Sequence, residues 1–301
     1  IISVRVPDDM TFDEAIDYFK GRIDIEFVEE DFIGEASFIP NDTYYNDYQW
    51  NLRIVSAEDG WNISNGGSPD IVVAVIDTGV AYEDFQVYKR ASDFSYNTFI
   101  SGYDFVNNDS HPNDDNGHGT HVCGTIAQET NNNYGCAGLA YNVKIMPIKA
   151  LNEEGWGYYS DWIAGIYCSV DYGANVINMS FGGDSYGQTL HEAVIYAKNN
   201  DVIVCCASGN DNSNLLYPAG FPESIAVGSI NSSKGKSSLS NYGSELDVIA
   251  PGEEILQETI IGDGDYNTDF YFYSGTSTSC PHVSALAAMI LSINTSFSYK
   301  A

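Results

Sequence analysis

Positive charge is scarce in this chain, and long apolar runs are absent. Only 12 of the 301 residues are Lys or Arg, against 42 Asp or Glu, which gives a formal net charge of −30. Because proteins bind nucleic acid by neutralising phosphates with Lys and Arg, we expect no nucleic-acid partner. No run of about 18 or more apolar residues occurs, so we expect no membrane span. The surplus carboxylates predict an acidic, solvated surface on which some of them bind calcium.

Cysteine is sparse, and no two cysteines stand in the C-x-x-C spacing of zinc sites. Most lie among Ala, Gly, Val or Ser, which predicts small buried side chains, although disulfides stay open. The chain begins IISVRVPDDM, without an initiator Met or a basic leader, so we expect that the gene starts further upstream. The cysteines are Cys123, Cys136, Cys168, Cys205, Cys206 and Cys280.

Residues 1–37 are expected to form a small α+β segment. The pattern predicts a strand (ISVRV), a helix capped by Thr11 and Glu14, and a second strand (DIEFVEED). A piece of this size cannot build a core of its own, so we expect it to pack on the main domain. Residues 38–50, FIPNDTYYNDYQW, are polar and aromatic and are interpreted as a linking arm.

The remainder, residues 38–301, alternates continuous apolar strands with helical stretches. This pattern is typical of a mainly parallel sheet covered by helices on both faces, a three-layer α/β/α fold. In such folds ligands bind outside the carboxyl ends of the strands. The predicted strands are 71–77, 143–150, 175–181, 201–208 and 224–230, and the helices between them are 118–129, 159–173 and 187–200.

Several side chains suited to nucleophilic catalysis end such strands or begin helices. Asp77 ends a buried strand, and His118 lies between glycines at a helix start. Ser277 enters an apolar helix with Pro281 expected in its first turn, where the N–H groups favour a developing oxyanion. Asn210 ends another strand, where its amide could donate to the same oxyanion. Singly, these residues are explained equally well as a turn Asp, a structural His, an N-cap Ser and a turn Asn.

Together, the segments around these residues resemble the subtilase family. They read DTG at Asp77, GHGTHVCGTIA at His118, SGN ending at Asn210 and GTSTSCPH at Ser277. Their order in the chain, Asp, His, Ser, is that of the family. The resemblance implies a serine endopeptidase with Asp77, His118 and Ser277 as its triad and Asn210 as an oxyanion donor.

The resemblance also implies an extended substrate groove with two edges. One edge and its outer pocket consist of Gly155, Trp156, Gly157 and Tyr159. The other edge, which walls the primary pocket, consists of Ser180, Phe181, Gly182 and Gly183. Leu216 falls near the base of that pocket, so we expect an apolar or aromatic residue before the scissile bond, and Asp211 could relax this towards basic residues.

Two loops are similar to calcium sites of the family. YDFVNNDSHPNDDNGHGTH resembles the thermitase branch, and it supplies Asp104, Asp109 and Asn113. A looser match to the family's strong site consists of Asp42, Asp84 and Asn132. Hard oxygen ligands of these types suit Ca²⁺, so structural calcium is expected, whereas a merely solvated acidic loop is the alternative.

The two ends of the chain depart from the family. Residues 1–37 resemble the second half of an inhibitory propeptide, with processing expected near Ser37, and the chain stops soon after the Ser277 helix. Either the chain is a fragment cut at both ends, or part of the scaffold is missing. The main hypothesis is a secreted, monomeric zymogen that cleaves polypeptides and is inhibited by its own propeptide segment. A latent or non-catalytic homologue and an intracellular processing protease are the alternatives.

Overall fold

The computed structural model describes residues 2–32, 38–262 and 265–297. The chain divides into two compact units, Ile1–Ser37 and Phe38–Ala301. No helix in the described part of the chain is long and apolar enough to cross a membrane.

The first unit contains one helix, α1 (Phe12–Lys20), which begins as predicted. The Thr11 hydroxyl accepts a hydrogen bond from the Glu14 backbone N–H, and the Glu14 carboxylate accepts one from the Thr11 backbone N–H. The two predicted strands were wrong, since residues 2–32 form no strand. A strand is stable only when a neighbouring strand satisfies its backbone donors and acceptors. The local sequence of a segment does not determine whether such a neighbour is present.

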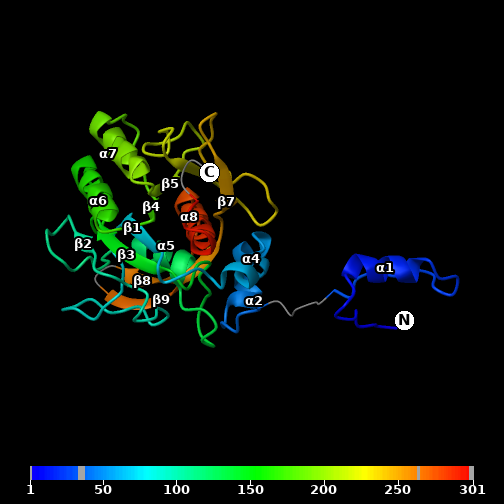
Figure 1. The fold of residues 1–301 in the computed structure, drawn as a ribbon. Helices are drawn as coiled ribbons and strands as arrows, with labels where there is room; N and C mark the ends of the chain where they lie inside the picture. Colours follow the sequence, from blue (N-terminus) through cyan, green and yellow to red (C-terminus); the bar gives the residue numbers. More distant parts are fainter. Residues whose placement is uncertain (1, 33–37, 263–264, 298–301) are drawn as a thin grey trace. The chain divides into compact units, whose positions relative to one another are not determined.

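The second unit is built on a seven-stranded sheet in which every pairing is parallel (Figure 1). The strand order is β2-β3-β1-β4-β5-β6-β7, so β1 lies inside the sheet between β3 and β4. The strands are β1 (Val72–Asp77), β2 (Tyr103–Asp104), β3 (Lys144–Lys149), β4 (Val176–Met179), β5 (Ile203–Ala207), β6 (Ile225–Ile230) and β7 (Val248–Pro251).

Helices cover both faces of this sheet, which confirms the predicted three-layer α/β/α fold (Figure 1). Strand β1 shows why its sequence is continuously apolar. Val73 and Val75 pack on α5 (His118–Ala127) and α8 (Thr276–Ile293) in one core. Ala74 and Ile76 face the other core, formed with α6 (Tyr159–Asp171) and α7 (Gln188–Asn199).

Smaller elements complete the second unit. The segment interpreted as a linking arm contains α2 (Tyr45–Tyr48), and α3 (Trp50–Ile54) and α4 (Ala57–Ser64) follow it. An antiparallel hairpin, β8 (Ile255–Gly262) with β9 (Asp265–Tyr273), was not predicted. It packs on α5, so it brings backbone carbonyls to the helix that begins at His118.

Two buried histidines are held neutral in this unit. His121 Nε2 donates to the carbonyls of Ile255 and Tyr271, at 3.0 and 3.2 Å. His282 Nδ1 donates to the Thr278 carbonyl, and its Nε2 accepts from Asn51 Nδ2 at 2.8 Å. Burial lowers the pKa of His121 to about 3 and that of His282 to about 4.

These pKa values predict acid destabilisation below pH 6.5. In the unfolded chain both imidazoles take up protons near their ordinary pKa, whereas in the folded protein they stay neutral, so stability falls as the pH falls. For His282 the loss is about 2 kcal/mol at pH 5. Urea unfolding of wild type and His282→Gln between pH 7 and 5 measures this, with the steeper decline expected in wild type. Equal declines would contradict the prediction.

Candidate active site

Asp77 and His118 meet at the carboxyl end of β1. The Asp77 carboxylate is fully buried, and its Oδ1 accepts hydrogen bonds from His118 Nδ1 at 2.7 Å and from the Thr78 backbone N–H at 2.8 Å. The approach depends on Gly119, since a Cβ there would lie 2.1 Å from the Gly79 carbonyl and 3.2 Å from Asp77 Oδ1. Glycine after His118 therefore lets the first turn of α5 reach the strand end.

The carboxylates around His118 raise the pKa of its imidazole. Burial alone would lower the pKa of His118, but the charge and hydrogen bond of Asp77 and the charge of Asp114 raise it, and the net shift is upward. Because Nδ1 is held by Asp77, Nε2 is the nitrogen left to exchange a proton with a reacting group.

Asp114 is a positioning residue that the sequence analysis missed. Its buried carboxylate accepts from the backbone N–H groups of Asn116, Gly117 and Thr120 and from the hydroxyls of Thr78 and Thr120. An acidic side chain before a helix N-terminus satisfies free N–H groups and complements the helix dipole. An aspartate four residues before a helix-starting histidine was the available signal.

Ser277 and Asn210 lie side by side. A Cβ on Gly275 would be 3.2 Å from both Ser277 Oγ and Asn210 Nδ2. Asn210 Oδ1 accepts from the Thr276 backbone N–H at 2.8 Å and from the Thr276 hydroxyl at 3.1 Å. These bonds fix the amide so that its Nδ2 remains the donor end, beside the serine hydroxyl.

Pro281 differs from its predicted position. Helix α8 begins at Thr276, so Pro281 is its sixth residue and lies beyond the first turn. It lacks the N–H that would otherwise bond to the carbonyl of Ser277, four residues earlier. The helix nevertheless continues to Ile293, because its apolar side packs against the sheet and α5.

Helices α5 and α8, which begin at His118 and Thr276, pack against each other, and the loops after the parallel strands β1 and β5 leave the same end of the sheet. Among the described residues no hydrogen bond joins His118 to Ser277. In unliganded hydrolases such bonds are often long and tighten only in the substrate complex. The arrangement places a carboxylate, an imidazole, a hydroxyl and an amide donor at the carboxyl end of the sheet.

The first predicted groove edge, Gly155 to Gly157, is tied to the same end of the sheet. The Asp77 carbonyl accepts from the N–H groups of Ala150 and Leu151, and Asn116 Nδ2 donates to the Glu153 carbonyl. Trp156 follows this anchored turn and is 72% exposed, so its ring is available to a ligand.

The second predicted edge continues from β4. Ser180 is buried and accepts from Asn178, and Gly183 exchanges two backbone hydrogen bonds with Tyr217 at 2.9 Å. The two edges are linked, because the ring of Trp162 packs between Phe181 and Tyr159. In addition, the Tyr159 hydroxyl donates to the Ser185 carbonyl at 2.8 Å.

Leu216 lies beside the second edge. A Cβ on Gly182 would be 2.8 Å from Leu216 Cβ, and a Cβ on Gly209 would be 2.8 Å from Leu216 Cγ. Its side chain is therefore in close contact with both segments that follow β4 and β5.

The residues predicted for the looser calcium site are only partly brought together. Asp42 Oδ2 accepts from the Asn131 backbone N–H at 2.7 Å, while its Oδ1 is buried without a partner. Asn132 Nδ2 donates to Asp93, not to Asp84. Asp84 is exposed on a loop that is closed by the hydrogen bond from the Ala91 N–H to the Ala81 carbonyl, and its carboxylate accepts from the Arg90 N–H.

Asp93 is the buried carboxylate of this region. Burial raises the pKa of Asp93 to about 8, against hydrogen bonds from Asn132 and Cys136 that lower it, and the charges of Glu258 and Asp42 raise it further. Glu258 accepts from the backbone N–H groups of Ser92 and Asp93, so it anchors this segment to β8. No group of three or more His, Cys, Asp or Glu side chains is placed to hold a metal ion in the described part of the chain.

The residues predicted for the thermitase-like calcium loop are also only partly brought together. Asp104 and Asp109 exchange two backbone hydrogen bonds, at 2.9 and 3.1 Å. Asn113 instead donates to Glu83 at 3.0 Å, and its Oδ1 is buried without a partner. Burial alone would raise the pKa of Glu83, but hydrogen bonds from His111, Tyr82 and Asn113 lower it.

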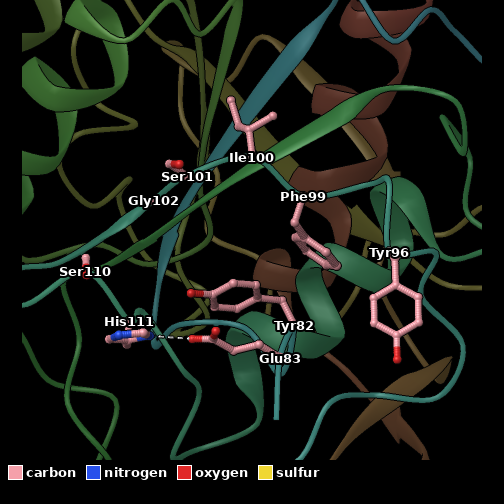
Figure 2. Close-up of a pocket in the computed structure, with 9 residues that line it drawn as sticks. All are labelled: Tyr82, Glu83, Tyr96, Phe99, Ile100, Ser101, Gly102, Ser110 and His111. Atoms are coloured by element: carbon pink, nitrogen blue, oxygen red, sulfur yellow. Dashed lines mark hydrogen bonds and ion pairs between the residues drawn. The ribbon is translucent and has the colours of Figure 1, made fainter. Parts of the chain in front are cut away.

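Glu83 and His111 border an open cavity beside this loop. Figure 2 shows their ion pair, 2.8 Å long, below a wall formed by Ile100–Gly102. The lining contains neither Asp77, His118 nor Ser277, so the cavity is separate from the candidate active site.

All six cysteines carry free thiols. Burial raises the pKa of the Cys123, Cys136 and Cys280 thiols well above the ordinary value, so these side chains are inert at neutral pH. Five of the six are buried, as the sequence analysis predicted for most of them, and Cys168 is half-buried.

Comparison with known proteins gives one consistent result. Residues 68–300 match the profile of the subtilase family. The chain is 40% identical to a thermophilic serine proteinase of Bacillus sp. (strain AK1), covering 89% of this chain and 63% of that protein. It is 37% identical to thermitase of Thermoactinomyces vulgaris, covering 85% and 86%. A solved protease structure from Pseudoalteromonas arctica superposes with a TM-score of 0.76 at 30% identity, covering 87% and 89%.

Replacing Asp114 tests its positioning role. In Asp114→Asn the amide cannot accept all five bonds, so buried donors lose partners and the free energy of unfolding falls by about 2 to 5 kcal/mol. The pKa of His118 falls as well, since a negative charge that raises it is removed. Urea unfolding and an NMR titration of the imidazole measure the two effects. Asp84→Asn, at an exposed site, is the control; an unchanged His118 pKa in Asp114→Asn would refute the role.

Proposed function

Since the chain belongs to the subtilase family, we propose that it is a serine endopeptidase acting through Asp77, His118 and Ser277. The observation that carries this proposal is the 2.7 Å bond from His118 to buried Asp77, at the sheet end where Ser277 stands beside the Asn210 amide. Polypeptides are the proposed substrates.

The reaction proceeds by acyl transfer. Ser277 Oγ attacks the carbonyl carbon before the scissile bond while His118 Nε2 takes the hydroxyl proton. Asp77 holds the imidazole by Nδ1 and stabilises its charged form. The proton then passes to the leaving amine nitrogen as the C–N bond breaks, and water hydrolyses the acyl-enzyme by the same route, with His118 again as base.

The negative oxygen of each tetrahedral intermediate is stabilised by two donors, Asn210 Nδ2 and the Ser277 backbone N–H. Thr276 fixes the orientation of the Asn210 amide, because its N–H and its hydroxyl both donate to Asn210 Oδ1 and leave Nδ2 to face the substrate oxygen. Helix α8 begins at the residue before Ser277, so its positive dipole end adds to this stabilisation.

The groove supports an extended substrate strand between Gly155–Gly157 and Ser180–Gly183. The apolar surroundings of the second edge, Phe181, Leu216 and Tyr217, favour an apolar or aromatic residue before the scissile bond.

Residues 1–37 are proposed to act as a propeptide segment that inhibits the enzyme until it is cleaved. The proposed protein is a secreted monomer. A latent homologue would carry the same side chains without reacting, so the reactivity of Ser277 separates the two hypotheses.

Calcium is proposed to bind beside Asp42. The buried, unpartnered Asp42 Oδ1 and the neighbouring Asp93 carboxylate offer hard oxygen ligands of the kind that Ca²⁺ prefers. A bound cation would compensate two buried carboxylates in a protein of net charge −30. Asp104, Asp109 and the unpartnered Asn113 Oδ1 are proposed for a second, weaker site.

The catalytic assignment is tested with a fluorophosphonate probe and peptide substrates. Wild type is expected to be labelled at Ser277, and Ser277→Ala is expected to lose both labelling and hydrolysis. Asn210→Ala should lower kcat by about 100- to 1,000-fold, the cost of removing the side-chain oxyanion donor of a homologous protease. Asn214→Ala, at an exposed asparagine of the same loop, is the control. Peptide hydrolysis that survives in Ser277→Ala would exclude the proposal.

The calcium proposal is tested by thermal unfolding with calcium and after chelation. At calcium 100-fold above its Kd, wild type should gain about 2.7 kcal/mol of stability. Asp42→Asn should lose this gain, whereas Asp84→Asn, at the exposed site that the sequence suggested, should keep it. A gain that survives in Asp42→Asn would rule out the Asp42 site.

A further inference from the structure

Five side chains contact one another beside the second groove edge and form what is called the His191 cluster below. They are Tyr186, His191, Tyr217, Phe221 and Glu223. His191 lies in the first turn of α7, whereas the other four lie in the loops that follow β4 and β5. The cluster therefore joins three separate segments of the chain, and the acyl-transfer steps use none of its side chains.

The imidazole of His191 is engaged at both nitrogens and on one face. Nε2 donates to the Glu223 carboxylate at 2.7 Å, and Nδ1 lies 3.1 Å from the Tyr186 hydroxyl oxygen. The ring stacks on that of Phe221, with the centroids 4.4 Å apart and 10° between the planes. The side chains of His191 and Glu223 are each only 19% exposed, so their charge-assisted hydrogen bond is partly shielded from water. One side chain thus ties the loop after β4 to the loop after β5.

The cluster reaches the groove edge through Tyr217. The Tyr217 ring packs on Phe221 at 4.8 Å and edge-on against Tyr186 at 5.5 Å. Its backbone exchanges two hydrogen bonds with Gly183, the last residue of the second edge, each 2.9 Å long. Both partners of this backbone pair are therefore connected to His191, Gly183 through the loop that carries Tyr186 and Tyr217 through Phe221.

The pair between Gly183 and Tyr217 is an isolated bridge and not part of a longer ladder. A short antiparallel pairing is marginally stable by itself, so its geometry depends on the side chains packed around it. A peptide that adds as a strand along Ser180–Gly183 would pair with backbone groups that this bridge holds in place.

We propose that His191 is a positioning residue, which holds the bridge between Gly183 and Tyr217 and so keeps the second groove edge in the conformation that pairs with an extended peptide. This inference rests on the proposed protease function, because that function supplies the peptide. The apparent affinity for a ligand falls in proportion to the fraction of molecules in the binding-competent conformation. Loss of His191 therefore weakens peptide binding and leaves the reacting groups unchanged.

Amide hydrogen exchange tests the positioning role without any substrate. In His191→Ala the N–H groups of Gly183 and Tyr217 should exchange about 3- to 10-fold faster than in wild type, as the loss of modest hydrogen bonds predicts. Tyr186→Phe removes one hydroxyl only and should give a smaller increase. His191→Gln carries an amide that can donate to Glu223 and accept from Tyr186, so it should restore slow exchange. Unchanged exchange of both amides in His191→Ala and in Tyr186→Phe would overturn the proposal.

Kinetics test the consequence for the groove. With a tetrapeptide anilide, His191→Ala should raise KM about 3- to 10-fold and leave kcat nearly unchanged, because only the competent fraction falls. Hydrolysis of p-nitrophenyl acetate, which is too short to pair along the edge, should proceed as in wild type. Equal losses with both substrates, or an unchanged KM for the anilide, would refute the role of His191.

Tyr196→Phe is the matched control for Tyr186→Phe. The Tyr196 hydroxyl also makes a single hydrogen bond to a side chain, donating to Asp171 Oδ1 at 2.7 Å. This bond joins the C-terminal ends of α7 and α6, whereas His191 lies at the start of α7. The control should keep wild-type exchange at Gly183 and wild-type KM. A KM that rises equally in the two variants would indicate general loosening and contradict the proposal.

The two measurements separate this inference from the protease function. Faster exchange in His191→Ala together with no hydrolysis by wild type would refute the protease function and keep the role of His191 in holding the bridge. Hydrolysis by wild type with unchanged exchange in His191→Ala would refute the role of His191 alone.

Discussion

The hydrogen bond between Asp77 and His118 is the constraint around which the second unit is arranged. It requires a helix start to approach a strand end within van der Waals contact, which Gly119 permits. It also requires a fully buried carboxylate whose Oδ2 has no partner among the described residues. Burying such a charge is costly unless a cation faces it, and in the proposed reaction His118 becomes that cation when it takes the serine proton. The same interaction that fixes the imidazole therefore raises its affinity for a proton.

Buried charges tie the surrounding loops to this bond. Lys149, opposite Asp77 in the register of β3 and β1, donates to the carbonyls of Thr78 and Leu151 and to Asp115. It thus joins the loops that follow both strands to the loop that precedes His118. Asp114, on the same loop, accepts hydrogen bonds from the Gly117 and Thr120 N–H groups at the start of α5. In so acidic a chain, Lys149 offsets the negative charge of Asp115, with which it forms an ion pair 2.6 Å long.

The features of this arrangement that depend on short stretches of sequence could be predicted from the sequence. Strand β1 and helix α5 follow from continuous apolar runs and glycine spacing, and the motifs at Asp77, His118, Asn210 and Ser277 identified their neighbourhood. Asp93 and Glu258 were missed, because their roles depend on contacts across 165 residues that no local pattern encodes. The two strands predicted within residues 2–32 were wrong for a different reason. The local sequence favours an extended backbone, but no neighbouring strand pairs with either segment.

The unpredicted hairpin connects these regions physically. From β8, the Ile255 carbonyl accepts from His121 in α5, and Glu258 holds the N–H groups of Ser92 and Asp93. One rigid hairpin thus supports both the helix that begins with His118 and the segment that carries the buried carboxylate near Asp42. A cation that ordered that segment would act on α5 through β8, in which Glu258 and Ile255 lie three residues apart, and through the Asn131–Cys136 loop that follows α5. The Asp93 segment and the placement of His118 would then be coupled by the Glu258 carboxylate and the Ile255 backbone carbonyl.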